Sequence, residues 1–221
     1  MTPNRNACEA FIRANTRLNA VPFVPEIKLH CADEAHDLWH KTQKELDQIS
    51  LEPPFWAFAW AGGQGLARYL LDNPDIVAGK RVFDFASGSG LVAIAAKMAG
   101  AHAVTANDID PFSVAACSLN ASANNVDIAI KQTDIVGQNL SGYDILLAGD
   151  VFYDQHMAKT IWPWFKQLHE NGIEVIIGDP SRAYVPKNQL QKRANYHIPV
   201  MRALEDADVK NTNVWALTLN A

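Results

Sequence analysis

A strand, a glycine-rich turn, a helix and a second strand follow one another near the middle of the chain. An apolar run that ends at Asp84 breaks into the turn 85–90, and a helix-like stretch follows over 91–98. A second apolar run, residues 103–107, then reaches Asp108. Units of this order, with an acid at each strand end, hold nucleoside-bearing cofactors at the carboxyl edge of a parallel sheet. The segment therefore predicts an α/β fold with a ligand site at that edge.

The same alternation of strand and helix patterns extends over residues 55–180. The predicted strands are 81–85, 103–107, 128–131, 145–148 and 174–178, and the predicted helices are 64–72, 91–99, 111–123 and 156–169. Short links between such elements favour a parallel sheet with helices on both faces. Near the end, a short helix over 186–193 and strands over 196–201 and 213–219 predict an antiparallel strand at the sheet edge.

The first 54 residues lack this alternation and are expected to form an N-terminal appendage with helices. We predict a helix over 7–19, a strand over 26–31 and a second helix over 33–49. The two prolines at 53 and 54 mark the end of this part. The predicted domains are therefore residues 1–54 and residues 55–221.

Composition narrows the classes of function. The chain has 221 residues and a net charge of −5 with no basic block, which disfavours a nucleic-acid partner. Cys8, Cys31 and Cys117 are scattered, which predicts neither a disulfide framework nor a metal site and favours a reducing compartment. The start of the chain does not resemble a signal peptide, and no apolar run reaches the roughly 20 residues of a membrane span. We expect a cytoplasmic protein without a membrane partner.

The glycine-rich turn has two interpretations as a cofactor loop. Residues 88–93 satisfy the loose dinucleotide fingerprint G-x-G-x-x-A, and Asp108 lies 18 residues after Gly90, near the spacing of a ribose-binding acid. The alternative is an S-adenosylmethionine loop, D-x-G-x-G-x-G, which residues 84–90 match except that Ala86 replaces the first glycine. A loop that merely turns the chain is the third possibility.

Two acids favour S-adenosylmethionine. A carboxylate at Asp84 would repel a pyrophosphate, but it suits the ammonium group of the methionine moiety. Asp134 follows the third predicted strand, where it can accept a hydrogen bond from the adenine amino group. Helix capping is the structural alternative for these acids, and we favour it for Asp110, which directly precedes Pro111. The predicted cofactor-binding residues are Trp60, Asp84, Ala86, Ser87, Gly88, Gly90, Asp108, Ile109, Asp134 and Asp150.

A second informative string, residues 149–154, follows the apolar run 145–148 and places Asp150 at a strand end beside the expected cofactor. Methyl transfer requires in-line placement of a nucleophile. A lysine nucleophile must also be neutral, although its reference pKa is about 10.4. Asp150 can orient the incoming ammonium, and an aromatic wall at Phe152 or Tyr153 can favour its proton loss. We therefore predict Asp150 and Tyr153 as catalytic residues. The structural alternative places both aromatics in the core and makes Asp150 a helix cap.

Aromatic residues gather in a third string, residues 53–65, which ends in a glycine-rich segment. Trp60 can cover the cofactor, or it can be part of a hydrophobic staple that leads into the next helix. Trp56 and Phe58 are expected in the core. Farther along, Arg182 follows a predicted strand and is a candidate for contacting an acidic partner.

Together these motifs resemble the class I, seven-β-strand methyltransferases. The D-V-F-Y string at 150–153 is similar to the D-x-x-Y signature of their protein-lysine branch. Strings spread over most of the chain are similar to the electron-transfer-flavoprotein β-subunit lysine methyltransferases: residues 13–18, 24–30, 54–60, 62–64 and 106–111.

This resemblance implies a Rossmann-like doubly wound sheet of strand order 3-2-1-4-5-7-6, with strand 7 antiparallel. It implies N-methylation of lysines on the flavoprotein β subunit, with residues 1–54 shaping the substrate cleft. Carried over by position, Asp84, Gly88 and Gly90 hold the methionine end, Asp108 the ribose and Asp134 the adenine, while Asp150 and Tyr153 face the lysine.

Other functions stay open from sequence. A ribosomal protein or a small amine such as nicotinamide can replace the flavoprotein as acceptor. A protein acceptor predicts an open groove, and a small amine predicts a closed pocket. A nicotinamide-dependent oxidoreductase and a non-catalytic binding module are the alternatives from other classes. We expect a monomer that acts on a protein.

Overall fold

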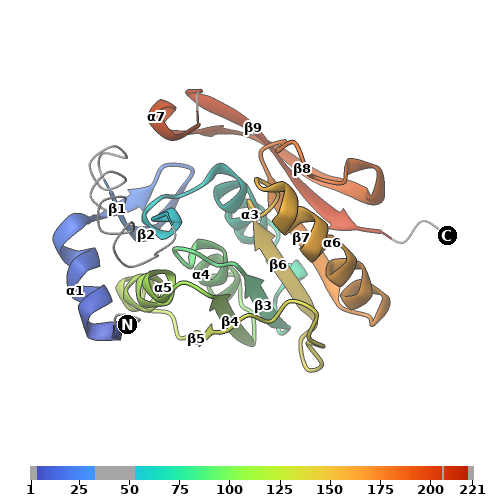
Figure 1. Ribbon diagram of the computed structural model, residues 1–221, viewed down its shortest axis with the longest axis horizontal. Helices are drawn as coiled ribbons and strands as arrows, with labels where there is room; N and C mark the ends of the chain where they lie inside the picture. The colour runs from blue at the N-terminus through green and yellow to red at the C-terminus, as the bar shows by residue number, and fades with distance from the viewer. Residues whose placement is uncertain (1–3, 33–52, 206, 219–221) are drawn as a thin grey trace.

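Seven strands form one sheet through the centre of the molecule (Figure 1). The computed structural model describes residues 4–32, 53–205 and 207–218, so the helix predicted over 33–49 lies outside the described residues. Across the sheet the strands are β5 (Ala129–Gln132), β4 (Ala103–Asp108), β3 (Arg81–Phe85), β6 (Ile145–Gly149), β7 (Glu174–Asp179), β9 (Val209–Leu217) and β8 (Leu190–Pro199). The strands from β5 to β7 are parallel, whereas β9 runs antiparallel to both of its neighbours. The predicted strand order, including the antiparallel last strand, is confirmed.

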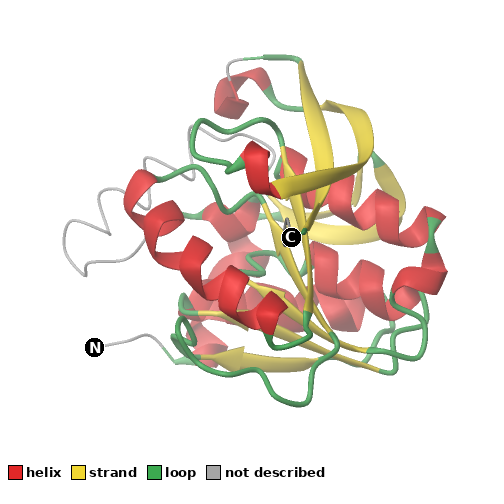
Figure 2. Ribbon diagram, turned by 90° about the vertical axis from the view of Figure 1, so that its right-hand side faces the viewer, coloured by secondary structure: helices red, strands yellow, loops and turns green. Residues whose placement is uncertain are grey.

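Helices cover both faces of this sheet (Figure 2). On one face lie α3 (Ala61–Asp72), α4 (Leu91–Met98) and α5 (Pro111–Ala123), and on the other lies α6 (Gln155–Glu170). The central strands are apolar on both sides, because alternate residues of a strand point to opposite faces. In β6, Ile145 and Leu147 pack with α3 and α4, while Leu146 packs with α6.

The start of α3 is pressed against the ends of the central strands. A Cβ atom at Gly178 would lie 2.1 Å from the carbonyl oxygen of Gly62, and one at Gly62 would lie 2.5 Å from the carbonyl oxygen of Gly178. Only glycine fits at either position without a shift of backbone. The two glycines therefore allow the amino end of α3 to reach the carboxyl ends of β6 and β7.

The amino-terminal part combines a helix with a small separate sheet. Helix α1 (Arg5–Asn15) ends four residues earlier than the helix predicted over 7–19. The reason is that Arg17–Val21 forms strand β1, which pairs antiparallel with β2 (Val24–Cys31). The backbone leaves the helix at Thr16, whose φ is −135° and whose hydroxyl donates to the carbonyl of Ile12. The pairing with β2 gives residues 17–21 hydrogen-bond partners that a longer helix would have had to supply. Both α1 and β2 pack on α5.

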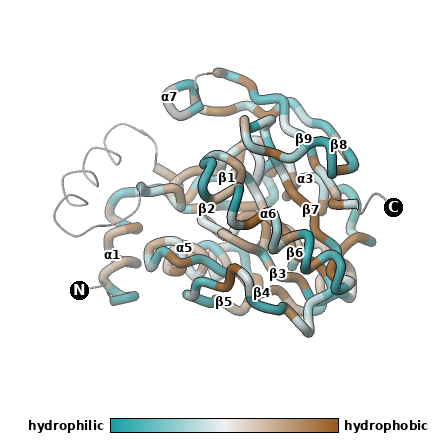
Figure 3. The backbone as a smooth tube through the Cα atoms, turned by 45° about the vertical axis from the view of Figure 1, so that its right-hand side comes forward, coloured by the Kyte–Doolittle hydropathy of each residue, from teal (hydrophilic) through white to brown (hydrophobic). Residues whose placement is uncertain are grey.

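The carboxyl-terminal part is more extended than the sequence suggests. Instead of a helix over 186–193, a single 3-10 turn at Lys187–Gln189 leads directly into β8, which pairs with β9. The short helix α7 (Arg202–Glu205) joins the two strands. Figure 3 shows hydrophobic residues concentrated along the inner strands and hydrophilic ones along the outer turns. Within the described part of the chain, no helix combines the length and apolarity needed to cross a bilayer.

Candidate functional site

A cavity of about 640 Å³ opens at the carboxyl edge of the parallel strands. The turns after β3, β4, β5 and β6 line it, together with residues from the segment before α3 and from the start of α6. Parallel strands bring these turns to one edge, which is why residues far apart in sequence meet there. The predicted site residues that line this cavity are Trp60, Asp84, Ala86, Ser87, Gly88, Asp108, Ile109, Asp134, Asp150 and Tyr153.

The glycine-rich turn after β3 is built from left-handed backbone. Ala86, Gly88 and Gly90 have φ values of 51°, 53° and 81°. Gly90 is the one predicted site residue that does not line the cavity. It is the N-cap of α4, and a Cβ there would lie 3.2 Å from Sγ of Cys117, so it shapes the turn instead.

Asp84 caps the helix that follows the glycine-rich turn through one of its carboxyl oxygens. Its Oδ2 accepts a hydrogen bond at 3.1 Å from the backbone N–H of Ala93, in the first turn of α4. Its Oδ1 is buried and has no partner among the described residues. Burial raises the pKa of this carboxyl well above its usual range, with Asp108 adding to the shift. One oxygen of this cavity-lining side chain is thus left without a hydrogen-bond donor among the described residues.

Asp108 joins the turn after β4 to the turn after β3. Its Oδ2 accepts from the backbone N–H of Gly88 at 2.9 Å, and its Oδ1 accepts from that of Asp110 at 3.0 Å. Burial raises the pKa of Asp108 to about 6. Asp110 caps α5 through the backbone N–H groups of Phe112 and Ser113, which confirms its predicted role.

Asp134 lies at the rim of the same end of the cavity. Its side chain is exposed, and its Oδ1 accepts from the backbone N–H of Val136 at 3.1 Å. This contact closes a tight turn after β5 and leaves Oδ2 toward solvent-accessible space. Three acids from three successive strand ends therefore surround one end of the cavity.

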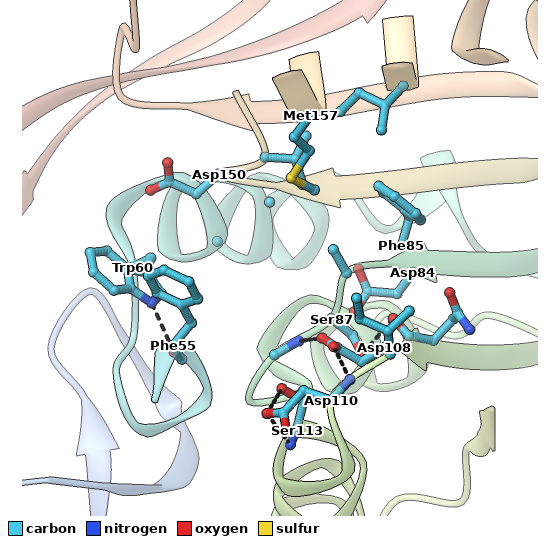
Figure 4. A pocket seen from close by; sticks show the side chains of 18 of the residues that line it. Phe55, Trp60, Asp84, Phe85, Ser87, Asp108, Asp110, Ser113, Asp150 and Met157 are labelled. Carbon is cyan, nitrogen blue, oxygen red and sulfur yellow. Dashed lines mark hydrogen bonds between the residues drawn. The ribbon is translucent and has the colours of Figure 1, made fainter. Parts of the chain in front are cut away.

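Asp150 lies on the other side of the cavity, near Trp60 and across from Asp84 and Asp108 (Figure 4). It is buried and has a left-handed φ of 63°. Its Oδ1 accepts from Nε of Arg182 at 2.7 Å, and its Oδ2 accepts from Nη2 of Arg182 and the backbone N–H of Gly62, both at 3.1 Å. The alternative that Asp150 caps the next helix is wrong, because Asp154 caps α6.

Aromatic rings form a wall beside Asp150. The ring centroids of Phe55 and Trp60 are 5.8 Å apart, and those of Phe55 and Tyr153 are 5.4 Å apart. Nε1 of Trp60 donates to the carbonyl of Phe55 at 2.8 Å, which fixes the indole. Tyr153 is 45% exposed and stands at the mouth, whereas Phe152 is fully buried in the core. Of the two aromatic residues predicted as a wall for the lysine, only Tyr153 therefore lines the cavity.

Some residues of the site were underestimated or missed from sequence. Phe58 is buried as expected, yet it also lines the cavity, as Phe55 and Met157 do. Arg182, predicted to contact an acidic partner, instead binds Asp150 within the chain. Its second partner, Glu205, had no motif that marked it. The contact between Arg182 and Asp150 could have been predicted from the expected pairing of β6 with β7, because that pairing brings residues 150 and 182 to neighbouring strand ends.

The two ends of the cavity differ in chemistry. One end presents a glycine-rich turn and several carboxylate oxygens, which suits a ligand with hydroxyl and ammonium donors. The other presents a buried carboxylate beside aromatic rings, which suits a cation on an apolar stem.

Comparisons with known proteins point to methyltransferases. Residues 67–151 match the family model described as Ribosomal protein L11 methyltransferase (PrmA). The electron transfer flavoprotein beta subunit lysine methyltransferase of Danio rerio is 34% identical, over 97% of this chain and 84% of that protein. A ribosomal protein L11 methyltransferase of Caldicellulosiruptor saccharolyticus is 47% identical, over 65% of this chain and 44% of that protein.

A solved structure shares the fold. The ribosomal protein L11 methylase from Lactobacillus delbrueckii subsp. bulgaricus aligns with a TM-score of 0.52 and 24% identity, over 74% of this chain and 81% of that one. The flavoprotein-related similarity thus spans nearly the whole chain. The L11-related family match is confined to the part that runs from α3 to the turn after β6.

Proposed function

The chain belongs to the family of electron transfer flavoprotein beta subunit lysine methyltransferases, and on this premise we propose how its cavity methylates lysines of that subunit. The methyl donor is S-adenosylmethionine. The observation that carries the proposal is the shared cavity, which has a carboxylate-rich end at Asp84 and Asp108 and a carboxylate with aromatic rings at Asp150. The donor would occupy the first end, and the substrate lysine would enter at the second.

The residues present fit this cofactor. The unpaired Oδ1 of Asp84 is a buried acceptor that suits an ammonium donor, and the methionine end carries one. Asp108 would hold the ribose hydroxyls and Asp134 the adenine amino group, with Gly88 allowing close approach of the turn. When bound, the cofactor supplies an electrophilic methyl group on a sulfonium centre.

Asp150 would attract the lysine ammonium and direct it toward the cofactor end. Trp60 and Phe55 would surround the aliphatic stem and keep water from the amine, and Tyr153 would close the mouth around it. The lysine must lose its proton before it can attack, because an ammonium has no free electron pair. The arrangement therefore supplies orientation and desolvation, the two contributions that methyl transfer needs most from the protein.

The test is methyl transfer from labelled S-adenosylmethionine into purified electron transfer flavoprotein. Ribosomal protein L11 and nicotinamide are assayed in parallel, since the L11 match makes that protein the second candidate acceptor. Label on β-subunit lysines is the expected result. Label on L11 alone would retain the fold and the cofactor and overturn the acceptor. The oxidoreductase alternative loses its support, because the relatives are methyltransferases.

We also propose that residues 1–54 help to shape the substrate entrance, since Pro53 lines the cavity beside Phe55. A monomer in the cytoplasm is the proposed form of the enzyme. Cys8 and Cys117 are buried thiols outside any disulfide, which is consistent with a reducing compartment. Sedimentation of the purified protein tests the monomer, and localisation of a tagged chain tests the compartment.

A further inference from the structure

Arg182 lines the cavity and connects three buried carboxylates, of which Asp150 lines the cavity and Asp179 and Glu205 do not. Its guanidinium binds Asp150 through Nε at 2.7 Å and Glu205 through Nη1 at 3.0 Å and Nη2 at 3.1 Å. Its backbone N–H donates to Oδ1 of Asp179 at 2.8 Å. The side chains of Asp150 and Glu205 are only 4% and 3% exposed, so these charges act on one another with little solvent screening.

The charges of this cluster do not balance. Asp150, Asp179 and Glu205 contribute three negative charges when ionised, against one from Arg182 and one from Lys210, whose Nζ lies 3.6 Å from Glu205. The cluster thus carries one net negative charge among the described residues. The other titratable side chains that line the cavity are Asp84, Asp108, Asp110, Asp134, Tyr153 and His156.

Asp150 has room for one more donor while it holds Arg182. A carboxylate offers about four acceptor positions, two on each oxygen. Oδ2 already accepts from Nη2 of Arg182 and from Gly62, whereas Oδ1 accepts only from Nε of Arg182. An arriving ammonium can therefore bind Oδ1 without displacing the arginine, which also lines the cavity and lies 6.0 Å from the Trp60 ring centroid.

A lysine bound there would stand beside both a carboxylate and a guanidinium. Carboxylates favour the charged form of an amine, and a neighbouring cation disfavours it. Without Arg182 the three carboxylates would hold the lysine as an unreactive ammonium. With Arg182 present, the cluster attracts the lysine with one net negative charge, which is enough to draw the ammonium toward Asp150.

We propose that Arg182 sets the protonation state of the substrate lysine, keeping Asp150 attractive to the ammonium while allowing its proton to leave. This inference rests on the proposed function, because it presumes a lysine at Asp150. In the step concerned, the N–H bond breaks, the proton passes to water at the cavity mouth, and its electron pair stays on Nζ. Arg182 does not touch the reacting atoms in this step, and it acts on the lysine only through its charge and through the position of Asp150.

The backbone around the cluster supports a fixed placement. Asp150 and Ser181, the residue before Arg182, have left-handed φ values of 63° and 68°, which non-glycine residues adopt at a cost. The N–H of Asp150 also donates to the carbonyl of Gly178 at 2.8 Å, joining the ends of β6 and β7. A cation held on such a frame does not need to reorganise when the lysine arrives.

The first experiment measures kcat against pH with purified flavoprotein and saturating donor, after the wild type has been shown to methylate it. Arg182→Gln raises the net negative charge of the cluster to two. The midpoint of its kcat profile should move upward by about one pH unit or more. Activity should then fall about tenfold at neutral pH and recover near pH 10, with no rise in KM. Arg182→Lys should keep the wild-type midpoint.

Two companion variants separate charge from structure. Arg182→Gln combined with Glu205→Gln restores one net negative charge, so the midpoint should return toward the wild type. Glu205→Gln alone leaves no net charge, so the midpoint should move downward and KM should rise. Glu205→Gln also keeps the test valid if Arg182→Gln does not fold. Arg81→Gln, which removes an exposed pair with Asp144 away from the cavity, is the matched control and should shift nothing.

The outcomes distinguish a failure of the proposed role of Arg182 from a failure of the proposed function. An equal loss of kcat at every pH in Arg182→Gln, or no downward shift in Glu205→Gln, would assign Arg182 a purely structural role and overturn the proposal. A wild type that binds cofactor but does not methylate flavoprotein would instead overturn the proposed function. In that case an affinity measurement for a lysine peptide still tests the charge effect, since Arg182→Gln should bind the protonated peptide more tightly than the wild type.

Discussion

The backbone N–H of Gly88 donates to Oδ2 of Asp108 at 2.9 Å, across 20 residues of sequence. The carboxylate at the end of β4 therefore holds the glycine-rich turn that follows β3. One side chain thus fixes the shape of the turn and presents an acceptor to the cavity, so its removal should affect both.

Asp108→Asn should weaken binding of S-adenosylhomocysteine about tenfold or more, because hydrogen bonds to a charged group contribute roughly 1.5–3 kcal/mol. Isothermal titration calorimetry measures the change. Asp110→Asn is the matched control, since asparagine caps helices as well as aspartate does. Equal affinity in Asp108→Asn and the wild type would remove Asp108 from the ribose site.

Cofactor affinity should fall as the pH drops below about 6, where Asp108 becomes protonated. The ionised carboxylate accepts hydrogen bonds on both oxygens, whereas protonation turns one oxygen into a donor and removes the charge, so affinity should fall to about the level of Asp108→Asn. Titrations between pH 5 and pH 8 test this dependence. Asp108→Asn should bind weakly at every pH, and a pH dependence retained in that variant would assign the effect to another group.

Asp150→Ala should lose turnover by about 100-fold or more while it keeps most of its cofactor affinity. Misplacement of a reacting group by about 1 Å already has an effect of this size. Arg182 keeps its pair with Glu205 in this variant, so the fold should persist. Single-turnover methylation and calorimetric binding are measured together, and unchanged turnover would exclude Asp150 from the site.

Ala86→Gly should stabilise the protein by up to about 1 kcal/mol, because Ala86 has a left-handed φ of 51° that glycine adopts without strain. Urea unfolding measures the free energy. Gly79→Ala is the reverse control and should destabilise, since Gly79 has a φ of 74° and no described atom lies within 4 Å of an added Cβ. A less stable Ala86→Gly would mean that packing of the Ala86 methyl outweighs its backbone strain.

Asp179→Asn should be more stable than the wild type at pH 8, by about 1–3 kcal/mol. Burial and the charge of Asp150 raise the pKa of Asp179 to about 6, and its Oδ2 is buried without a partner among the described residues. Since the folded-state pKa lies above the unfolded value, the penalty is present above pH 6 and disappears as the pH falls toward 4. Thermal unfolding at pH 8 and pH 4.5 should show the gain shrinking, and a destabilised variant at pH 8 would contradict it.

Much of the central fold could be predicted from local patterns. The bounds of β3 and α5 coincide with their predicted ranges, because an apolar run bounded by polar turns marks the strand and Asp110 with Pro111 marks the helix start. Strand β1 was missed because residues 17–19 were assigned to the end of the preceding helix, although residues 17–20 alternate polar and apolar side chains. Only pairing with β2 gives that segment its structure, and four of its five residues are exposed.

The carboxylate-rich end of the cavity, at Asp84 and Asp108, was predicted more completely than the end at Asp150. Asp84 and Asp108 lie at the carboxyl ends of β3 and β4, and Asp134 follows β5, so the topology alone brings them together. The contact between Asp150 and Arg182 joins residues 32 apart, and Glu205 comes from a four-residue helix between two strands. No local pattern distinguishes such a helix, because its position depends on the strands that it connects.

The reversed direction of β9 determines where the chain leaves the sheet. Asn213 pairs with Asp179 near the cavity, whereas Ala216 pairs with Ile176 deeper in the sheet, so β9 runs away from the reactive edge (Figure 1). The end of β9 at Leu217 consequently lies on the side of the sheet opposite the cavity. Immobilising the protein on a solid support through a linker attached after Leu217 would leave the cavity facing the solution, where a large folded acceptor can reach it.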